Sequence, residues 1–366
     1  MVLKHLAFEG FRNLVDSEVD FHPEINLIVG ENASGKTSLL EAIYYLAVGR
    51  SFRTHRDNEL KKFGAPHLKV RGEAEGPQGY TTAQIVFYEG TKLLSLADRK
   101  ILRLSDYLGW CPVITILLED IELIRGAPNT RRDFINLAIA QLNRNYLKDL
   151  IEYRKALQER NKLLNEKVDE SYYEVWEKIL AQIACRIIEE RKKKLSILLD
   201  YAQKYSDMLF EGKKIVFRYK SDHDLAELSS ATEIERTMLE LLKNKRTLDI
   251  ELGHTTVGPH RDDIIVEEVK SSGEKLLLSK YGSEGEQRLC ALALKLAEAQ
   301  MIQEFRNLSP IYLLDEIAAE LDSQNTKKLF RSITGQMFYA TAKDQNNLGL
   351  TPGKVFKITK GTITSQ

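Results

Sequence analysis

One short stretch constrains the fold of this chain more than any other feature of its sequence. Residues 30–37, Gly-Glu-Asn-Ala-Ser-Gly-Lys-Thr, match the pattern G-x-x-x-x-G-K-[ST]. They follow an apolar run at 25–29 that is typical of a strand buried on both faces, and they precede a stretch at 38–48 with the pattern of a helix. A strand before and a helix after are the context in which this pattern forms a phosphate-binding loop. We therefore predict a nucleotide-binding loop at 30–37.

The residues of this loop have separate expected roles. Its glycines permit backbone conformations that turn successive N–H groups toward phosphate oxygens, and the helix beginning near Lys36 adds the positive end of its dipole. Lys36 is expected to reach the β- and γ-phosphates of ATP and to take part in catalysis, and Thr37 is expected to bind Mg²⁺. The ATP ligands predicted in this segment are Gly30, Glu31, Asn32, Ala33, Ser34, Gly35, Lys36, Thr37 and Ser38.

A second apolar run, at 311–314, ends in two acidic residues, Asp315 and Glu316. An acid at the end of a buried strand can hold Mg²⁺, so Asp315 is predicted as a metal ligand beside Thr37. Glu316 is predicted to be catalytic, because its carboxylate can polarise the water that attacks the γ-phosphate. An apolar run followed by an acid is also an ordinary strand ending. The pair therefore supports a nucleotide role only in combination with the phosphate loop.

Adjacent Asp and Glu residues favour an ABC-type ATPase, which needs a signature loop from a second subunit to close over the γ-phosphate. Residues 281–288, Tyr-Gly-Ser-Glu-Gly-Glu-Gln-Arg, resemble the LSGGQ signature at the start of a predicted helix. Gly282, Glu284 and Glu286 stand where the signature has Leu, Gly and Gln. A Gly-Ser turn that caps a helix is the plainer interpretation of this segment taken alone. The nucleotide ligands predicted here are Ser283, Gly285, Glu286 and Gln287.

A further loop of these ATPases contacts the dimer partner, and residues 319–322 resemble it, with Asp322 at the matching acid. Asp322 is therefore added to the predicted nucleotide-site residues, and a simple helix-capping role is the alternative. No glutamine can be assigned to the magnesium-sensing loop of this class. The strand expected at 337–341 ends at Thr341, where many of these ATPases have a switch histidine.

The chain divides into three parts by the periodicity of its apolar residues. Residues 1–118 have the pattern of short strands with one helix, and residues 119–245 have apolar positions every three or four residues, which predicts antiparallel helices. Residues 246–366 return to a mixed pattern. The simplest architecture is one α/β head assembled from both ends of the chain, with a helical insert.

Individual elements follow from the same patterns and from turn residues. An antiparallel layer is expected from strands at 67–75, 80–89 and 91–103. In the last part we expect a hairpin of 256–269 and 274–278, a helix at 284–304, and final strands at 336–341 and 355–364.

Composition excludes several classes of protein. Lys plus Arg and Asp plus Glu are both 53, so the net charge is zero, and any DNA-binding surface must come from local segregation of charge. The 3 cysteines are far apart and form no CxxC, which argues against a disulfide framework or a zinc site. The N-terminus lacks a signal peptide and no apolar stretch is long enough to cross a bilayer. These features predict a cytoplasmic protein.

Four further segments, combined with the nucleotide motifs, give the chain an overall resemblance to the RecF family. They are 11–14 (Phe-Arg-Asn-Leu), taken as the opening strand, 49–53 (Gly-Arg-Ser-Phe-Arg), 126–132 (Gly-Ala-Pro-Asn-Thr-Arg-Arg) and 258–263 (Gly-Pro-His-Arg-Asp-Asp). The resemblance covers essentially the whole chain. It implies an α/β fold, an ABC/SMC-like P-loop ATPase head with a mixed sheet plus an antiparallel β layer, and a compact α-helical insert domain.

The resemblance also implies a function. Members of this family are expected to bind ATP and Mg²⁺, to form an ATP-dependent homodimer and to hydrolyse ATP slowly, stimulated by DNA. They are expected to bind single-stranded gaps and duplex junctions in DNA, and to help RecR and RecO place RecA there.

No linear motif in the sequence recognises bases. Positive side chains are available for phosphates, which require only charge and hydrogen-bond donors. These candidates are Arg12, Arg50, Arg53, Arg56, Arg131, Arg132 and Arg261. The run 191–194, Arg-Lys-Lys-Lys, is interpreted as a solvated helix face, because two glutamates precede it.

Other P-loop proteins remain as alternatives. A transporter ATP subunit would have its signature near the phosphate loop and a membrane partner. An OLD-like DNA-processing enzyme would need a metal-binding carboxylate cluster in a further domain. A GTPase would have N-K-x-D after a strand, and the sequence has none.

Overall fold

The computed structural model describes residues 1–166, 168–342 and 351–365. The chain forms two compact units, a head unit of Met1–Asp120 and Glu298–Gln366, and an arm unit of Ile121–Ala297. The head unit is thus built from both ends of the chain. The arm unit continues beyond residue 245, where the insert was expected to end, because strand β10 (Asp263–Val269) pairs with strand β9 (Lys214–Lys220) inside the insert.

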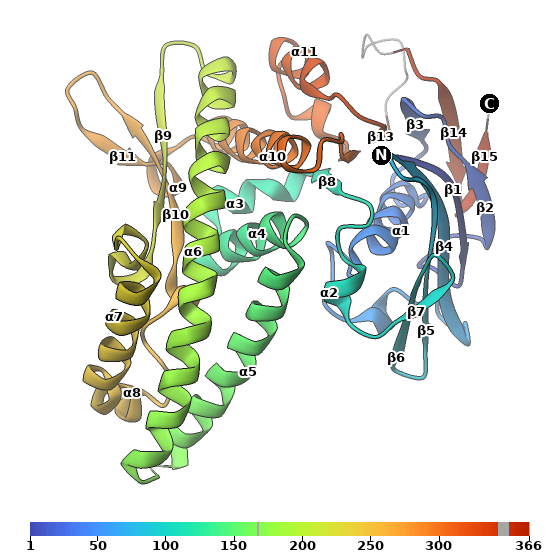
Figure 1. Ribbon diagram of the computed structural model, residues 1–366. Coiled ribbons are helices and arrows are strands. Elements are labelled where there is room, and N and C mark those ends of the chain that lie inside the picture. Colours follow the sequence, from blue (N-terminus) through green and yellow to red (C-terminus); the bar gives the residue numbers. More distant parts are fainter. Residues whose placement is uncertain (167, 343–350, 366) are drawn as a thin grey trace. The chain divides into compact units, whose positions relative to one another are not determined.

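A mixed sheet of the head unit combines strands from the two ends of the chain (Figure 1). Its order is β15-β14-β3-β13-β12-β8, and neighbouring strands are parallel except for β14 and β15. The strands are β3 (Ile25–Val29), β8 (Val113–Ile116), β12 (Ile311–Asp315), β13 (Met337–Thr341), β14 (Lys354–Thr359) and β15 (Thr362–Ser365). Because β3 and β12 both run parallel to β13, their carboxyl ends lie at one edge of the sheet, where α/β sheets bind ligands.

A second, antiparallel sheet of the head unit has the order β2-β1-β4-β5-β6-β7. Its strands are β1 (Val2–Glu9), β2 (Ser17–Asp20), β4 (His67–Gly76), β5 (Gly79–Tyr88), β6 (Thr91–Leu96) and β7 (Arg99–Ile101). The predicted combination of a mixed sheet and an antiparallel layer is confirmed.

Two expectations for this layer were wrong. The single strand expected at 91–103 is two short strands, because Ala97 and Asp98 have positive φ angles of 49° and 58° and form a tight turn. The segment 11–14 is not the opening strand. That strand is β1, which ends where Gly10 and Arg12 adopt positive φ angles of 61° and 50°.

Helix α1 (Lys36–Val48) packs between the two sheets of the head unit (Figure 1). It contacts β12 and β13 on one side and β4 and β5 on the other, and every residue except Thr37 is buried. A helix covered on all sides has no polar face, which explains its nearly uniform apolar sequence. The shorter head elements are η1 (Asp57–Glu59), α2 (Leu104–Tyr107), η2 (Leu118–Ile121), η5 (Ile317–Ala319) and α11 (Ser323–Ser332).

Helices dominate the arm unit, and the long helix α6 packs along α5 and α7 (Figure 1). The helices are α3 (Glu122–Arg125), α4 (Pro128–Ala140), α5 (Arg144–Glu166), α6 (Glu170–Leu209), α7 (Ala231–Asn244), α8 (Arg246–Leu252) and α9 (Leu278–Tyr281), with η3 (Asp222–Glu227) and η4 (Pro259–Arg261). Helix α10 (Glu284–Arg306) begins in the arm unit and ends in the head unit. None of the helices within the described ranges is long and apolar enough to cross a membrane.

The arm unit also contains a sheet with the order β11-β10-β9, where β11 is Lys275–Leu277. The helical insert predicted at 119–245 was therefore wrong at β9. Its alternating buried and exposed residues are a strand pattern, but the strand lies between the helices α6 and α7. The expected hairpin is present, although its first strand begins at Asp263 rather than at 256.

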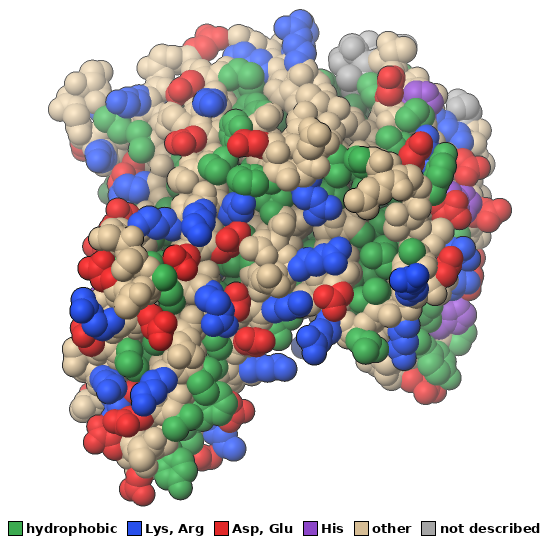
Figure 2. Space-filling view, viewed as in Figure 1, with side chains coloured by type: hydrophobic (Ala, Val, Ile, Leu, Met, Phe, Trp, Pro, Cys, Tyr) green, Lys and Arg blue, Asp and Glu red, His purple; other side chains and the backbone are tan. Residues whose placement is uncertain are grey.

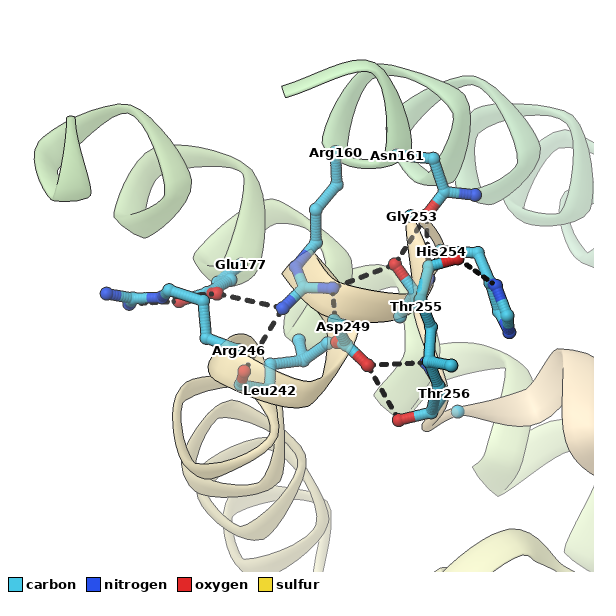
Figure 3. A network of polar contacts seen from close by, with 12 residues as sticks. Arg160, Asn161, Glu177, Leu242, Arg246, Asp249, Gly253, His254, Thr255 and Thr256 are labelled. Atoms are coloured by element: carbon cyan, nitrogen blue, oxygen red, sulfur yellow. Dashed lines mark hydrogen bonds and ion pairs between the residues drawn. The ribbon is translucent and has the colours of Figure 1, made fainter. Parts of the chain in front are cut away.

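A buried ionic network joins helices α5, α6 and α8 with the segment 254–256 (Figure 3). Arg160, which is 0% exposed, donates to Asp249 Oδ2 at 2.7 Å, Thr255 Oγ1 at 2.8 Å and Glu177 Oε1 at 3.1 Å. Arg246 donates to the other oxygen of Glu177 at 2.7 Å. The buried charges are thus compensated within the arm unit, as buried charges must be.

Candidate nucleotide site

The loop between β3 and α1 has a conformation that requires its glycines. Gly35 has a φ of 120°, a region that side chains rarely adopt. A Cβ atom at Gly30 would lie 2.5 Å from the carbonyl oxygen of Ile358 and 2.6 Å from Ser34 Oγ. Ala33 has a φ of 61° despite its side chain, a strain of a kind that is concentrated at functional sites. The backbone at 30–35 is therefore held in the cradle shape that the sequence predicts.

Lys36 lies inside this cradle and is only 5% exposed. Its Nζ donates to the carbonyl oxygens of Gly30 at 2.9 Å and Glu31 at 3.0 Å. The same atom lies 3.2 Å from Glu316 Oε1. A buried ammonium surrounded by carbonyl oxygens and one carboxylate is well placed to exchange these partners for phosphate oxygens.

The two predicted metal ligands meet, although they are far apart in the sequence. Thr37 Oγ1 donates to Asp315 Oδ2 at 2.6 Å. In the described part of the chain, Asp315 Oδ1 and Ser34 Oγ are buried and have no hydrogen-bond partner. Burial raises the pKa of Asp315; Glu316 and Glu119 act in the same direction, while the Thr37 hydroxyl opposes them. Unpaired buried oxygens beside a hydroxyl and a carboxylate fit Mg²⁺, which prefers oxygen ligands.

Glu316 begins the turn after β12 in a left-handed conformation, with a φ of 51°. This conformation is unusual for a side chain other than glycine. The carboxylate of Glu316 is one-third exposed, at 33%, and contacts Lys36. The structure therefore brings Lys36, Thr37, Asp315 and Glu316 together at the carboxyl edge of the mixed sheet.

Asn13 belongs to the surroundings of the loop and was not among the predicted site residues. Ser38 Oγ, predicted to be an ATP ligand, donates to Asn13 Oδ1 at 2.8 Å. Asn13 Nδ2 donates in turn to the carbonyl oxygen of Ala33 at 3.1 Å. One amide side chain thus links the loop to the second residue after Lys36. The only sequence signal was the inclusion of Asn13 in the family segment 11–14.

The predicted signature residues lie in the arm unit and form a helix cap at the start of α10. Ser283 N donates to Glu286 Oε2 at 2.7 Å, and Glu286 N donates to Ser283 Oγ at 3.3 Å. This reciprocal pair is a capping box. Ser283 and Gly285 are exposed, whereas Gln287 is buried and donates to the carbonyl oxygen of Leu278 at 2.9 Å. The cap leaves Ser283 and Gly285 on the surface and commits the side chain of Gln287 to the arm unit.

Asp322 caps helix α11. A capping role was the alternative to a role in the nucleotide site. Its Oδ1 accepts from Asn325 N at 2.8 Å and its Oδ2 from Asn325 Nδ2 at 2.7 Å. The hydrogen bond from the backbone of Asn325 lowers the pKa of Asp322. Asp322 is exposed, so this cap leaves the residue on the surface of the head unit.

Some arginines proposed for DNA phosphates already have internal partners. Arg12 donates to both oxygens of the buried Glu41, at 2.7 and 2.9 Å. Arg131 is 8% exposed and makes two hydrogen bonds to Asp263, which link the family segments 126–132 and 258–263. The expectation that 191–194 is a solvated face was wrong at Arg191, which is buried and bonds to Asp262.

Arg56 is 84% exposed, and Arg50, Arg53, Arg132 and Arg261 are at least partly exposed. On the face in Figure 2, basic side chains are interspersed with acidic ones.

Comparisons with known proteins agree with an ATPase of this fold. The family described as AAA ATPase domain matches residues 1–347. The chain is 35% identical over 376 residues to the DNA replication and repair protein RecF of Ligilactobacillus salivarius, covering 100% of this chain and 98% of that protein. It is 35% identical over 371 residues to the protein of the same name from Streptococcus gordonii, with coverage of 99% and 100%.

Comparison with solved structures also finds RecF proteins. The recombination mediator protein RecF in the RecFOR pathway, described as RecF-ATP, superimposes with a TM-score of 0.92 at 30% identity, covering 100% of this chain and 97% of that chain. The structure described as RecF-ATPrS gives a TM-score of 0.91 at 30% identity, with coverage of 99% and 97%. An Smc head bound to the C-winged helix domain of ScpA gives 0.58 at 17% identity, covering 100% of this chain and 98% of that chain, which shows a likeness of fold alone.

Proposed function

The chain belongs to the RecF family of DNA replication and repair proteins, and we propose that it is an ATP-driven recombination mediator that closes as a dimer on DNA. The observation that carries this proposal is the meeting of Lys36, Thr37, Asp315 and Glu316 at one edge of the mixed sheet. These are the residue types that phosphoryl transfer requires: a cation, a hydroxyl, a metal-binding carboxylate and a candidate base.

ATP would bind with its phosphates in the loop 30–37. Lys36 would release the carbonyl oxygens of Gly30 and Glu31 and bind phosphate oxygens instead. Thr37 and Asp315 would hold Mg²⁺, which when bound neutralises charge on the phosphates. Glu316, no longer paired with Lys36, would accept a proton from the attacking water at its carboxylate. We propose slow hydrolysis of ATP to ADP and phosphate, stimulated by DNA.

The nucleotide would be enclosed by a second copy of the chain. Ser283, Glu284 and Gly285 of the Ser283 loop are exposed and lie at the amino end of α10, where an anion can bind. We propose that this loop closes over the γ-phosphate bound by the Lys36 loop of the partner copy. Asp322, exposed at the start of α11, is a candidate contact across the same interface.

DNA would be bound by the closed dimer, at single-stranded gaps or at junctions of single and double strands. Arg12 and Arg131 each make two hydrogen bonds to one carboxylate. The candidates for phosphate contacts are therefore the partly or fully exposed arginines, Arg50, Arg53, Arg56, Arg132 and Arg261, although Arg53 also forms a weaker ion pair with Glu41. Such binding is expected to weaken with salt and to show little sequence preference. By family, the partners are RecR, RecO and RecA in the cytoplasm, and the outcome is loading of RecA on gapped DNA.

Two variants, sized with and without Mg²⁺ and ATP, test the proposal. Lys36→Met is expected to lose nucleotide binding and therefore to remain monomeric. Ser283→Arg is expected to bind ATP with ordinary affinity but to remain monomeric, because its side chain obstructs the trans interface. A Ser283→Arg chain that dimerises normally would show that the Ser283 loop does not close the site. DNA affinity that is the same with and without ATP would count against closure on DNA.

A further inference from the structure

Two carboxylates lie in the first turn of α10, next to Ser283, at positions where the LSGGQ signature is uncharged. Glu284 stands in place of a glycine and Glu286 in place of a glutamine. A loop that closes over a γ-phosphate would bring both negative charges toward the triphosphate. Like charges a few ångströms apart repel each other at a protein surface. The loop therefore suits a trans role only if these charges are compensated.

Each of the two carboxylates has a cation of its own in the arm unit. Arg288 Nη2 donates to Glu284 Oε1 at 2.7 Å, from one turn further along α10. Lys213 donates to Glu286 Oε1 and forms an ion pair with it. The other oxygen of Glu286 accepts from Ser283 N at 2.7 Å. Burial alone would raise the pKa of Glu286, but the hydrogen bonds from Lys213 and Ser283 outweigh it and lower that pKa.

Lys213 reaches the loop from a different part of the fold. It lies between the end of α6 at Leu209 and the start of β9 at Lys214, in a turn where Gly212 has a φ of 72°. β9 pairs with β10 from its first residue, with Lys214 opposite Val269. The ammonium group of Lys213 is therefore supplied by a turn that is fixed at both ends, and not by a neighbouring residue of α10.

We propose that Lys213 is a positioning residue that neutralises Glu286 and thereby allows the Ser283 loop to close over the nucleotide of another copy. The inference rests on the proposed ATP-dependent dimer. Lys213 acts through Glu286, whose carboxylate it holds against Ser283 N. Without Lys213, Glu286 can still accept the hydrogen bond from Ser283 N. Its negative charge would then be uncompensated when the loop closes over the triphosphate of the other copy.

The test is the dissociation constant of the full-length dimer with Mg²⁺ and a non-hydrolysable ATP analogue, measured by sedimentation equilibrium. Lys213→Ala is expected to raise this constant about tenfold, and more at low ionic strength, because an unscreened charge is exposed to the triphosphate. Affinity for the analogue under monomeric conditions is expected to stay unchanged. The matched control is Lys214→Ala, which removes the same charge from the next residue, where no ion pair with a described carboxylate exists. It is expected to have little effect.

A rescue experiment separates charge compensation from a merely structural role. Glu286→Gln retains an oxygen that can cap Ser283 but carries no charge. In the Glu286→Gln background, Lys213→Ala is expected to have no further effect on dimerisation. An equal loss in both backgrounds, or no loss in either, would overturn the inference while the wild-type dimer stands. A wild-type chain that stays monomeric with the analogue would overturn the dimer proposal, and this inference with it.

Discussion

The phosphate loop of the head unit and the ionic network of the arm unit are both buried and polar, but their polar atoms are paired differently. In the network, Asp249 and Glu177 each accept hydrogen bonds at both carboxylate oxygens (Figure 3), and Arg160 leaves only Nε without a partner among the described residues. Around the phosphate loop, Ser34 Oγ and one oxygen of Asp315 have no such partner.

The difference distinguishes a structural use of buried charge from a binding use. An unpaired buried oxygen costs free energy unless a ligand satisfies it, so its presence beside Lys36 points to a ligand. A network whose carboxylates are satisfied needs no ligand and fixes the packing of helices. Substitutions in the two regions should therefore affect different quantities.

The largest expected effect is on stability and lies in the network. Arg160→Met should lower the free energy of unfolding by about 3–5 kcal/mol, because it leaves the buried Asp249 without its cation and removes one of the two arginines that pair with the buried Glu177. Chemical denaturation measures this change. The control is Arg186→Met. Arg186 also joins two helices by an ion pair, with Asp149, but it is 48% exposed. The control substitution should cost less than about 1 kcal/mol. Equal effects would contradict the structural role assigned to the network.

The second expected effect is on ATP binding and concerns the phosphate loop. Lys36→Met should weaken ATP binding about 100-fold or more, because charge-assisted hydrogen bonds to phosphate are lost. Its stability without nucleotide should change little, since Met has a similar length and the lost partners are two carbonyls and a carboxylate that is one-third exposed. Calorimetric titration with ATP and thermal unfolding measure the two quantities. Lys327→Met, at an exposed lysine on α11 of the same unit, should alter neither.

The third expected effect is a pH dependence of stability that arises from a histidine in the arm unit. His260 lies between Tyr153 and Thr255: its Nε2 is 3.1 Å from the carbonyl oxygen of Thr255, which can only accept, so Nδ1 accepts from Tyr153 OH. Burial lowers the pKa of His260 to about 4. The unfolded chain then binds a proton that the folded chain excludes between about pH 6.5 and 4, so stability falls as the pH falls through this window. From pH 7 to pH 5 the loss should be about 2 kcal/mol.

Denaturation of wild type and His260→Gln at both pH values isolates this contribution. The variant should lose about 2 kcal/mol less than wild type over the same range. The same loss in both chains would assign the pH dependence to other groups.

The smallest expected effect comes from a comparison of two buried serines of the head unit, one with and one without a hydrogen-bond partner among the described residues. Ser34→Ala should change the stability of the nucleotide-free chain by less than about 0.5 kcal/mol, because its hydroxyl has no described partner to lose. It should weaken ATP binding several-fold. Ser51→Ala is the matched variant, because the buried hydroxyl of Ser51 donates to Glu41. It should lower the free energy of unfolding by about 1–2 kcal/mol without altering ATP affinity. The reverse pattern would contradict a binding role for the unpaired oxygens.

The phosphate loop and the acidic pair were predictable because each is encoded within a few consecutive residues, and the head fold because both ends of the chain have mixed strand and helix patterns. Residues 25–48 specify a strand, a loop and a helix locally, and the pattern at 311–316 ends a buried strand in two acids. The parallel pairing of both strands with β13 then brings these motifs together.

Features that depend on distant partners were not predictable. Arg191 stands in a basic run after two glutamates, and only the packing of α6 against the segment that contains Asp262 makes it a buried residue. Strand β9 has an alternating pattern of its own, but it lies between helices, and its partner β10 follows only after α7 and α8. The link from Lys213 to Glu286 spans 73 positions, and no local pattern encodes it.

Mixing the two interface variants tests most directly whether the Lys36 loop of one copy and the Ser283 loop of another share a nucleotide. In each homodimer, every site would contain one defect, so neither Lys36→Met nor Ser283→Arg should dimerise or hydrolyse ATP alone. A mixed dimer contains one site with both defects and one intact site. We expect the mixture to recover ATP-dependent dimers and a substantial part of the ATPase activity. A mixture as inactive as its components would contradict a site shared between copies.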